Sequence, residues 1–553
     1  MPPVPDDAAA PAAPRETVGP LVRGLAVLRA LTAAGGRSTL GDLARSTALA
    51  RSTVDRVAGT LHRVGHVHLS GREVTLAPRL MELGNAYLVS SGLAALGELT
   101  AELADSLDES VSVAVPDGDG VRFVRQTTRR RAMSLTFRIG DLLPAERGAP
   151  GALFAADWTA QDWSRWQARH EADPRDDAFP AVPAGRGDAG QTYPDRVAAA
   201  RTSGYALDDQ LIEPGLVAVA VPVHDAEGRA VCALSAVSHT RRHSAHSLRD
   251  AALPRLRATA ARMAEVLRAP RPDAGAPDAG ARAPWARSVK QELGPTFLES
   301  LARGLSVLAA FDADAEALPL TAVAERTGLA RATARRALIT LEHLGYVTAG
   351  DGRFRPTPRV LDLGFAHLSG LTLADIAQPH LAALVERVHE SASVSVLRGD
   401  QIQYVARVPT VRIMSVNITV GTRFPAYATS MGRALLAGLP EEERTAHLPA
   451  EGLAPLTPYT VTDPARLAGL LAEVRAQGYA MVDNELEEGL RSLAVPVRDA
   501  SGRPVAAVNV STHSSSSTAE GSRERLLPHL RAAAEAVESD LRVAGRCTRV
   551  ATG

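Results

Sequence analysis

Residues 320–352 read LTAVAERTGLARATARRALITLEHLGYVTAGDG. Apolar residues recur at helical spacing in two runs, first around Val323 and then from Ala334 to Leu341, and Gly328 lies between the runs. Glycine readily adopts the left-handed backbone conformation that a tight turn between two helices requires. The pattern therefore predicts a helix-turn-helix.

The second run carries a basic surface. If its apolar side packs into a core, the remaining surface presents Arg331, Thr333, Arg335, Arg336 and Thr340. Guanidinium groups suit phosphates and guanine edges. Residues 346–355 then place apolar flanks around the turn sequence AGDG, which is a hairpin signal, with Arg353 and Arg355 beside it. Together these features predict a winged DNA-binding domain; an ordinary solvated helix surface is the alternative for the arginines taken alone.

The same pattern occurs twice in the chain. Residues 23–28 (RGLAVL) return at 303–308 (RGLSVL), and residues 61–67 (LHRVGHV) return at 341–347 (LEHLGYV). Further on, the tripeptide GYA followed by AVPV occurs once in each half. A period this long indicates a duplicated two-domain unit rather than a solenoid repeat.

Composition sets the expected domain boundaries. The first residues are rich in Pro, Ala and Asp, and a second Ala/Pro/Gly-rich stretch without apolar periodicity separates the two units. The predicted domains are a disordered tail (1–16), winged helix-turn-helix 1 (17–85), effector-binding-like domain 1 (86–268), a linker (269–295), winged helix-turn-helix 2 (296–365) and effector-binding domain 2 (366–545).

Each winged helix is followed by a change in pattern. A connecting helix is expected near residues 358–371 and, in the first unit, near 78–93. Helices are then expected near 374–389 and 431–439. Short β-branched runs bounded by Gly, Asp or Pro predict strands near 393–397, 402–408, 412–416, 493–497 and 505–510. The fold class predicted for this part is α+β with a mostly antiparallel sheet.

Composition narrows the function. The net charge of -1 gives no global attraction to nucleic acid, so DNA binding has to come from local basic patches. The two cysteines are far apart and form no CxxC pair, and no run of 18 apolar residues or export leader is present, so a cytoplasmic protein that does not span a membrane is expected. The motifs GxxxxGK, HExxH and GxSxG are absent. We therefore expect neither an enzyme nor a cofactor.

Three stretches carry a family resemblance: FLESLARGL at 297–305, GTRFPAYATSMGRALLA at 421–437, and GYA through ELEEGLRS to PV at 478–497. With these, residues 17–268 and 296–545 resemble the isocitrate-lyase-regulator (IclR) family of bacterial transcription factors. The second unit is similar to the branch that controls aromatic-acid breakdown through β-ketoadipate. The resemblance implies winged helix-turn-helix domains, GAF-like effector domains, dimers or dimers of dimers, and small carboxylate effectors.

The resemblance also implies an effector pocket. Thr429 and Ser430 directly precede a helical run, where a hydroxyl can cap the helix and the free N–H groups can hold a carboxylate; a plain N-cap is the alternative. Arg491, expected on a loop, is a candidate counter-charge for an anionic effector, although an arginine on a loop is more often just solvated. The remaining residues that the resemblance implies for the pocket are Met431, Asp483, Ser492, Asn509 and Ser511, with Met414 as an apolar wall.

The two units differ at residues that are expected to contact DNA or the effector. Asp55 stands where Arg335 stands, Ala48 replaces Gly328, and Gly59 replaces Ile339 inside the recognition helix. A glycine in mid-helix costs about 0.5–1 kcal/mol, and a carboxylate repels phosphates. In the first pocket Pro150 replaces Met431, Val217 and Ala218 replace Arg491 and Ser492, and Ser235 replaces Asn509. The first winged helix keeps Arg51, Ser52, Thr53, Arg56 and Arg72.

These differences lead to a hypothesis about partners. The second unit is expected to carry most of the sequence recognition and effector sensing, and the first is expected to act as a weaker or differently specific partner. Because one chain holds two winged helices, it is expected to occupy two half-sites of a double-stranded, non-palindromic operator as an intrachain pseudo-dimer or as part of a homo-oligomer. The alternative is an effector sensor that acts through protein partners with little direct DNA binding.

Overall fold

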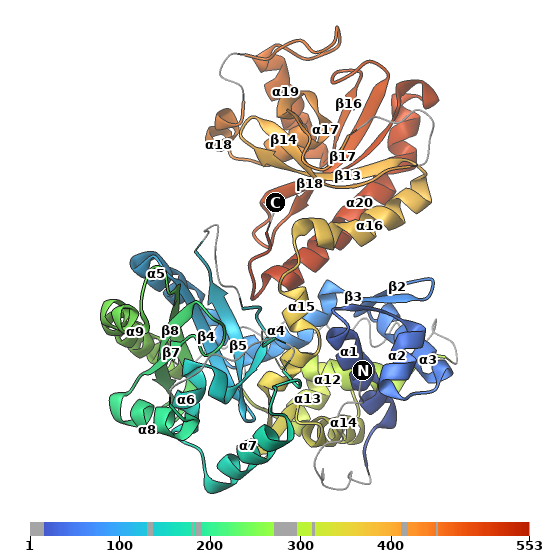
Figure 1. Ribbon diagram of the computed structural model, residues 1–553. Helices are drawn as coiled ribbons and strands as arrows, with labels where there is room; N and C mark the ends of the chain where they lie inside the picture. The colour runs from blue at the N-terminus through green and yellow to red at the C-terminus, as the bar shows by residue number, and fades with distance from the viewer. Residues whose placement is uncertain are drawn as a thin grey trace. The chain divides into compact units, whose positions relative to one another are not determined.

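The computed structural model describes residues 16–129, 137–179, 181–182, 191–269, 296–311, 316–410, 418–448 and 452–551. The chain divides into two compact units, Met1–Ser369 and Gly370–Gly553 (Figure 1). Most of the expected tail and linker, the expected strand at 412–416 and Met414 lie outside the described residues. None of the described helices is both long and apolar enough to cross a membrane.

The first compact unit, Met1–Ser369, contains the first copy of the duplicated sequence and the winged helix of the second copy, so it holds two winged helices of the same design. The winged helix of the first copy, called reader 1 from here on, consists of α1 (Gly19–Ala33), β1 (Arg37–Thr39), α2 (Leu40–Thr47), α3 (Arg51–Arg63), β2 (Val67–Ser70) and β3 (Glu73–Leu76). Reader 2 consists of α12 (Glu299–Ala309), β10 (Leu318–Pro319), α13 (Leu320–Thr327), α14 (Arg331–His343), β11 (Val347–Gly350) and β12 (Arg353–Pro356). Each three-stranded sheet is antiparallel, with the last strand in the middle. The predicted helix-turn-helix and wing are confirmed.

The turns explain why these segments stop where they do. Gly328 ends α13 with a φ of 65°, the left-handed conformation expected for it. Ala48 holds the same conformation at the end of α2, with a φ of 53°, although its Cβ makes that conformation unfavourable. In the wing of reader 2, Asp351 and Gly352 both have positive φ, as a tight two-residue hairpin turn requires.

The two readers pack against each other through α1 and α12. A Cβ atom on Gly24 would lie 2.2 Å from Leu301 Cδ1, and one on Gly304 would lie 2.5 Å from Leu21 Cδ2, so both glycines allow close approach of the helices. The backbone N–H of Val18 donates to Thr340 Oγ1 at 2.9 Å. Reciprocally, the N–H of Leu298 donates to Thr60 Oγ1 at 3.0 Å. Equivalent residues exchange equivalent contacts, which is the signature of a pseudo-twofold interface.

The α+β domain of the first unit is built on a six-stranded antiparallel sheet in the order β6-β5-β4-β9-β8-β7. Its strands are β4 (Ser110–Asp117), β5 (Gly120–Thr127), β6 (Leu142–Pro144), β7 (Ala206–Asp209), β8 (Leu216–His224) and β9 (Ala230–His239). Its helices are α5 (Gly97–Leu107), α6 (Ala149–Ala155), α7 (Ala160–Ala172), α8 (Tyr193–Ser203) and α9 (Ala245–Arg268). Helices α5 and α9 pack together, as do α6 and α8.

The second unit repeats this α+β fold. Its sheet order is β15-β14-β13-β18-β17-β16, and all neighbours are antiparallel. Its strands are β13 (Ser391–Arg398), β14 (Gln401–Val408), β15 (Arg423–Pro425), β16 (Ala480–Asp483), β17 (Leu490–Arg498) and β18 (Pro504–His513). Its helices are α16 (Leu373–Val388), α17 (Ser430–Ala437), α18 (Glu441–Ala446), α19 (Pro464–Gln477) and α20 (Ala519–Gly545). Helices α16 and α20 lie together on one face of the sheet, and α17 and α19 lie together on the other (Figure 1).

The expected connecting helices are shorter than predicted. Residues 358–371 form a 3-10 turn, Pro358–Asp362, and then the short helix α15 (Phe365–Leu368). Gly364 interrupts them with a φ of 90°, which ends helical geometry. In the first copy the continuous part is α4 (Met81–Ser90). Phe365 packs against Gly84 of α4, where a Cβ atom would be only 2.2 Å from the ring, so packing between the two connections favours the break.

A buried arginine fixes this region of the first unit. Arg122 is 1% exposed, and its guanidinium contacts Asp117 Oδ2 and Asp362 Oδ1, each at 2.6 Å. Its Nη1 also donates to the carbonyl of Gly140 at 2.7 Å. A buried charge with this many partners ties the α+β domain to the segment that follows reader 2.

Candidate nucleic-acid interface and effector pocket

Helix α14 presents most of the expected basic surface to solvent. Ala334, Leu338 and Leu341 are fully buried, which leaves Arg331, Arg335 and Arg336 exposed and Thr333 half-buried. The wing residues Arg353 and Arg355 are also exposed. The guanidinium side of the helix is therefore not packed away within the first unit.

The partners of these arginines are weak surface contacts. Arg335 Nη1 lies 2.7 Å from Glu16 Oε2, and Arg355 Nε lies 3.5 Å from Glu316 Oε1, with all four side chains more than half exposed. Such pairs contribute only about 0–1 kcal/mol. An external anion can displace them at little cost.

Thr340 is a correction to the expected interface. Its side chain is fully buried, its hydroxyl donates to the carbonyl of Arg336 at 2.7 Å, and the same oxygen accepts the N–H of Val18 from reader 1. A hydroxyl can make both bonds because it donates one proton and accepts with its lone pairs. Thr340 therefore joins the two readers and does not face a groove. Its counterpart Thr60 does the same in reader 1.

Reader 1 carries a mixed surface. Arg51, Ser52, Arg56 and the wing residue Arg72 are exposed, and Thr53 is half-buried. Asp55 is also exposed, and its Oδ1 lies 3.7 Å from Arg51 Nε one helical turn away. The positive charge of Arg51 thus partly offsets the negative charge of Asp55 within the same helix.

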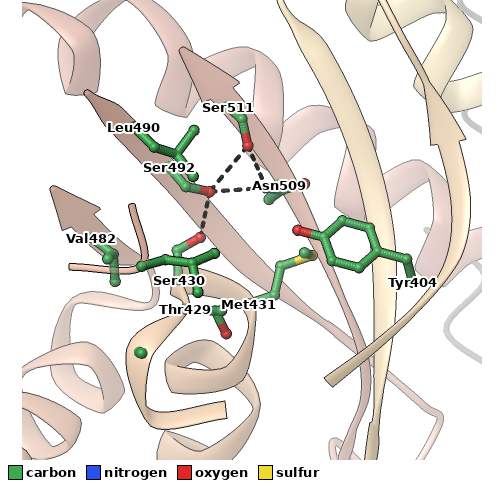
Figure 2. A pocket seen from close by; sticks show the side chains of 11 residues that line it. Tyr404, Thr429, Ser430, Met431, Val482, Leu490, Ser492, Asn509 and Ser511 are labelled. Carbon is green, nitrogen blue, oxygen red and sulfur yellow. Dashed lines mark hydrogen bonds between the residues drawn. The ribbon is translucent and has the colours of Figure 1, made fainter. Parts of the chain in front are cut away.

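The expected effector residues of the second unit meet at the start of α17. Thr429 caps this helix by accepting the N–H of Gly432 at 3.1 Å. Ser430 and Ser492 share a hydrogen bond of 2.7 Å between their hydroxyls, and Asn509 Nδ2 donates to Ser492 and to Ser511, each at 2.9 Å. Figure 2 shows these side chains converging from α17, β17 and β18 on one pocket.

Apolar groups form the rest of the pocket, and the sequence analysis missed most of them. Met431 lines the pocket as expected, together with the unexpected residues Tyr404, Val482, Leu486 and Leu490. Tyr404 is 3% exposed, and burial raises the pKa of its phenol to about 12. Among the described residues that line the pocket, none carries a charge. A ligand there meets hydroxyls, an amide and the N-terminal N–H groups of α17.

A buried polar atom of this pocket has no hydrogen-bond partner in the part of the chain that the structure describes. Asn509 is 2% exposed, and its Oδ1 accepts no hydrogen bond from any described residue. A buried acceptor without a donor costs about 1–3 kcal/mol. A ligand or water with an N–H or O–H group would recover that loss.

Arg491 and Asp483 lie outside this pocket, which corrects their expected role. Successive residues of a strand point to opposite faces, so Arg491 faces away when Ser492 faces α17. Arg491 is 6% exposed; its Nη2 contacts Asp483 Oδ2 at 2.7 Å, and its Nη1 contacts Ser522 Oγ of α20 at 3.2 Å. Asp483 likewise follows Val482, which is the pocket residue. The pair fastens the sheet to α20.

A second buried ion pair joins α17 to the segment that follows β16. Arg433 contacts Glu485 with two hydrogen bonds of 2.8 and 2.5 Å, and Glu485 also accepts the N–H of Val461 at 3.1 Å. Arg433 is only 3% exposed. This pair could not be predicted from the sequence, because Arg433 lies in an apolar helical run. By the duplication, the first unit has Ala152 and Leu211 at these positions.

The first α+β domain replaces the pocket with different groups. By the duplication, Asp208 stands at the position of Val482, and Ala218 at that of Ser492. Asp208 is fully buried; its Oδ1 accepts the N–H of Leu211 at 2.8 Å, and its Oδ2 has no partner among the described residues. Burial raises the pKa of this carboxyl to about 7. Asp208 is a buried titratable group that no sequence motif marks.

Asp208 is expected to make the stability of this domain depend on pH. Its pKa is raised on folding, so the folded state holds the proton up to about pH 7, whereas the unfolded chain releases it near pH 4. Stability present at pH 4 is therefore lost as pH rises toward 7, by up to about 1.4 kcal/mol per pH unit. In Asp208→Val, thermal unfolding followed by the fluorescence of Trp158, Trp163 and Trp166 should shift to a higher temperature at pH 8 and depend less on pH.

Glu213→Gln, at an exposed position of the same domain, is the matched control for this measurement. Its pH profile should follow that of the unsubstituted chain. An Asp208→Val profile with the original pH dependence would show that another group titrates.

Comparison with known proteins identifies both kinds of domain. The IclR helix-turn-helix domain matches residues 20–69 and 300–350, and the bacterial transcriptional regulator IclR C-terminal domain matches residues 86–265 and 365–539. The Pca regulon regulatory protein of Pseudomonas putida is 46% identical over 240 residues, which are 43% of this chain and 82% of that protein. The p-hydroxybenzoate hydroxylase transcriptional activator of Acinetobacter baylyi is 37% identical over 240 residues, 42% of this chain and 89% of that protein.

Among solved structures, the inducer-binding domain of a double mutant of the Acinetobacter PobR transcription factor, in complex with 3-hydroxybenzoic acid, is 31% identical. The match covers 30% of this chain and 97% of that domain, with a TM-score of 0.29. Both family models match twice, and together they account for most of the chain. The chain therefore belongs to the IclR family of bacterial transcriptional regulators, as a tandem duplication of the family's two-domain unit.

Proposed function

We propose that this chain is a cytoplasmic DNA-binding regulator that binds one double-stranded operator with both of its winged helices, reader 1 and reader 2. The observation that carries this proposal is the exposed guanidinium surface of Arg331, Arg335 and Arg336 on α14, beside the wing arginines Arg353 and Arg355. A recognition helix flanked by a basic wing is suited to phosphates and to base edges in the major groove. Because the two readers already pair within the chain, one molecule presents both recognition helices.

We further propose that the second unit senses a compact hydroxylated aromatic acid. The N-terminus of α17 and the hydroxyls of Ser430, Ser492 and Ser511 suit a carboxylate without any cationic side chain. The free acceptor on Asn509 suits a ligand hydroxyl, and Tyr404 and Met431 suit an aromatic ring. The names of the Pca and p-hydroxybenzoate relatives support an aromatic-acid effector.

A binding experiment on the full chain tests the DNA part. Operator fragments enriched from random DNA are titrated by fluorescence anisotropy at several salt concentrations. Arg335→Ala with Arg336→Ala should weaken binding and reduce the salt slope by about 0.9 for each lost phosphate contact. Arg475→Ala, an exposed helical arginine of the second unit, removes the same kind of charge and should leave the affinity unchanged. Unchanged binding in the double variant would favour a sensor that acts through protein partners.

The effector part is tested on the same protein by calorimetry with benzoate, 3-hydroxybenzoate, 4-hydroxybenzoate and protocatechuate. Hydroxylated acids should bind at least about fivefold tighter than benzoate, because only they satisfy Asn509. Asn509→Leu should abolish that difference, and Asp483→Asn, outside the pocket, should preserve it. Equal affinity for benzoate and the hydroxylated acids would remove the assigned role of Asn509.

A further inference from the structure

The reader pair makes residues of α3 and α14 directly comparable. The contacts between Val18 and Thr340 and between Leu298 and Thr60 are equivalent, as are the contacts of Gly24 and Gly304. A pseudo-twofold pair of readers places equivalent residues at equivalent positions of two inverted half-sites. A difference between the two helices therefore becomes a difference between the two half-sites.

Asp55 and Arg335 are such a pair of positions. Each is the fifth residue of its helix, and each side chain is exposed on the helix surface that the core does not use. The N-terminal part of a recognition helix is the part that contacts base edges. An arginine there pairs with O6 and N7 of guanine, whereas a carboxylate accepts a hydrogen bond from N4 of cytosine.

The surroundings of Asp55 allow a carboxylate to approach DNA. Arg51 lies 3.7 Å from Asp55, and Arg56 follows it in the chain, so this surface keeps a positive balance despite the acid. Arg335 is held in the free protein by Glu16 at 2.7 Å, an exposed pair that DNA can replace. Repulsion between the Asp55 carboxylate and the DNA phosphates is therefore not the only effect to expect at this position.

We propose that Asp55 determines specificity: it reads a cytosine in the half-site of reader 1, where Arg335 reads a guanine in the half-site of reader 2. The operator is then an inverted repeat broken at this base pair. The inference rests on the proposed DNA-binding function and adds to it the base that each half-site requires. Asp55 then contacts a base directly. Reader 1 binds a different base sequence and does not simply bind the same sequence more weakly.

Selection of binding sites from random double-stranded DNA, followed by sequencing, tests this with the full chain. The original chain should select half-sites that differ at one aligned position, guanine in one and cytosine in the other, with at least about fivefold discrimination at each. Asp55→Arg should restore guanine in both half-sites, and Arg335→Asp should give cytosine in both. Asp55→Asn should turn the cytosine preference toward adenine, because the amide suits N6 and N7 of adenine.

Asp105→Arg is the matched control, since it makes the same charge change at an exposed site of α5. It should raise affinity slightly through charge and leave the selected bases unchanged. If Asp55→Arg selects the same asymmetric site as the original chain, Asp55 reads no base and the inference is wrong. If the original chain enriches no sequence at all, the proposed DNA-binding function fails, and the inference fails with it.

Discussion

Gly304→Leu is expected to lower operator affinity by about 100-fold. Even a single Cβ atom at this position would lie 2.5 Å from Leu21, which is fully buried against it, so the larger side chain must push α12 away from α1. The readers would then bind as two loosely tethered modules. Linking two binding modules contributes roughly 10²–10⁴ in affinity only while both can engage at once, and a displaced α12 would no longer hold the two recognition helices at the spacing of two half-sites.

The control for this prediction is Gly469→Leu, because a Cβ atom on that exposed glycine of α19 would meet nothing within 4 Å. Anisotropy titrations should show normal operator binding for the control, and effector binding should be normal in both variants. Normal DNA binding by Gly304→Leu would mean that the α1–α12 contact does not organise the readers on DNA.

Arg433→Ala is expected to destabilise the second α+β domain by about 3–5 kcal/mol. Removing one partner of a buried pair leaves Glu485 charged and uncompensated in the interior. Replacing both partners with the residues of the first unit, Arg433→Ala with Glu485→Leu, should recover most of that stability. A buried pair exchanged for apolar groups is often neutral or stabilising.

Chemical unfolding followed by two signals separates the domains in this test. The sequence has no tryptophan after residue 285, so tryptophan fluorescence follows the first unit and circular dichroism follows both. In Arg433→Ala, the unfolding transition that circular dichroism detects and tryptophan fluorescence does not should shift to a lower denaturant concentration. The transition detected by tryptophan fluorescence should stay unchanged. If the double variant is as unstable as the single one, the charge left on Glu485 is not the cause.

The sequence was sufficient for features that depend on local periodicity. The face of α14 followed from helical spacing, and the wing followed from the AGDG turn. Ser492, Asn509 and Ser511 could be placed together because a family resemblance marked the strands on which they lie. These residues do meet at the start of α17.

The errors arose where partners come from distant parts of the chain. The family resemblance places Asp483 in the pocket, and Arg491 is expected there as a counter-charge, but strand alternation turns both side chains to the opposite face. Thr340 lies on the polar side of a helical projection, but the N-terminal segment of the other reader covers it. No periodicity within α14 can show that covering segment.

The pairing of two readers within one polypeptide changes how recognition can evolve. In a dimer of identical chains, one substitution in a recognition helix alters both halves of the operator at once, so any change must be tolerated twice. In this chain α3 and α14 are encoded separately, and a substitution in one leaves the other untouched. Under the proposed mode of binding, each half of the operator can therefore change by single mutational steps while the contacts of the other winged helix keep the protein bound.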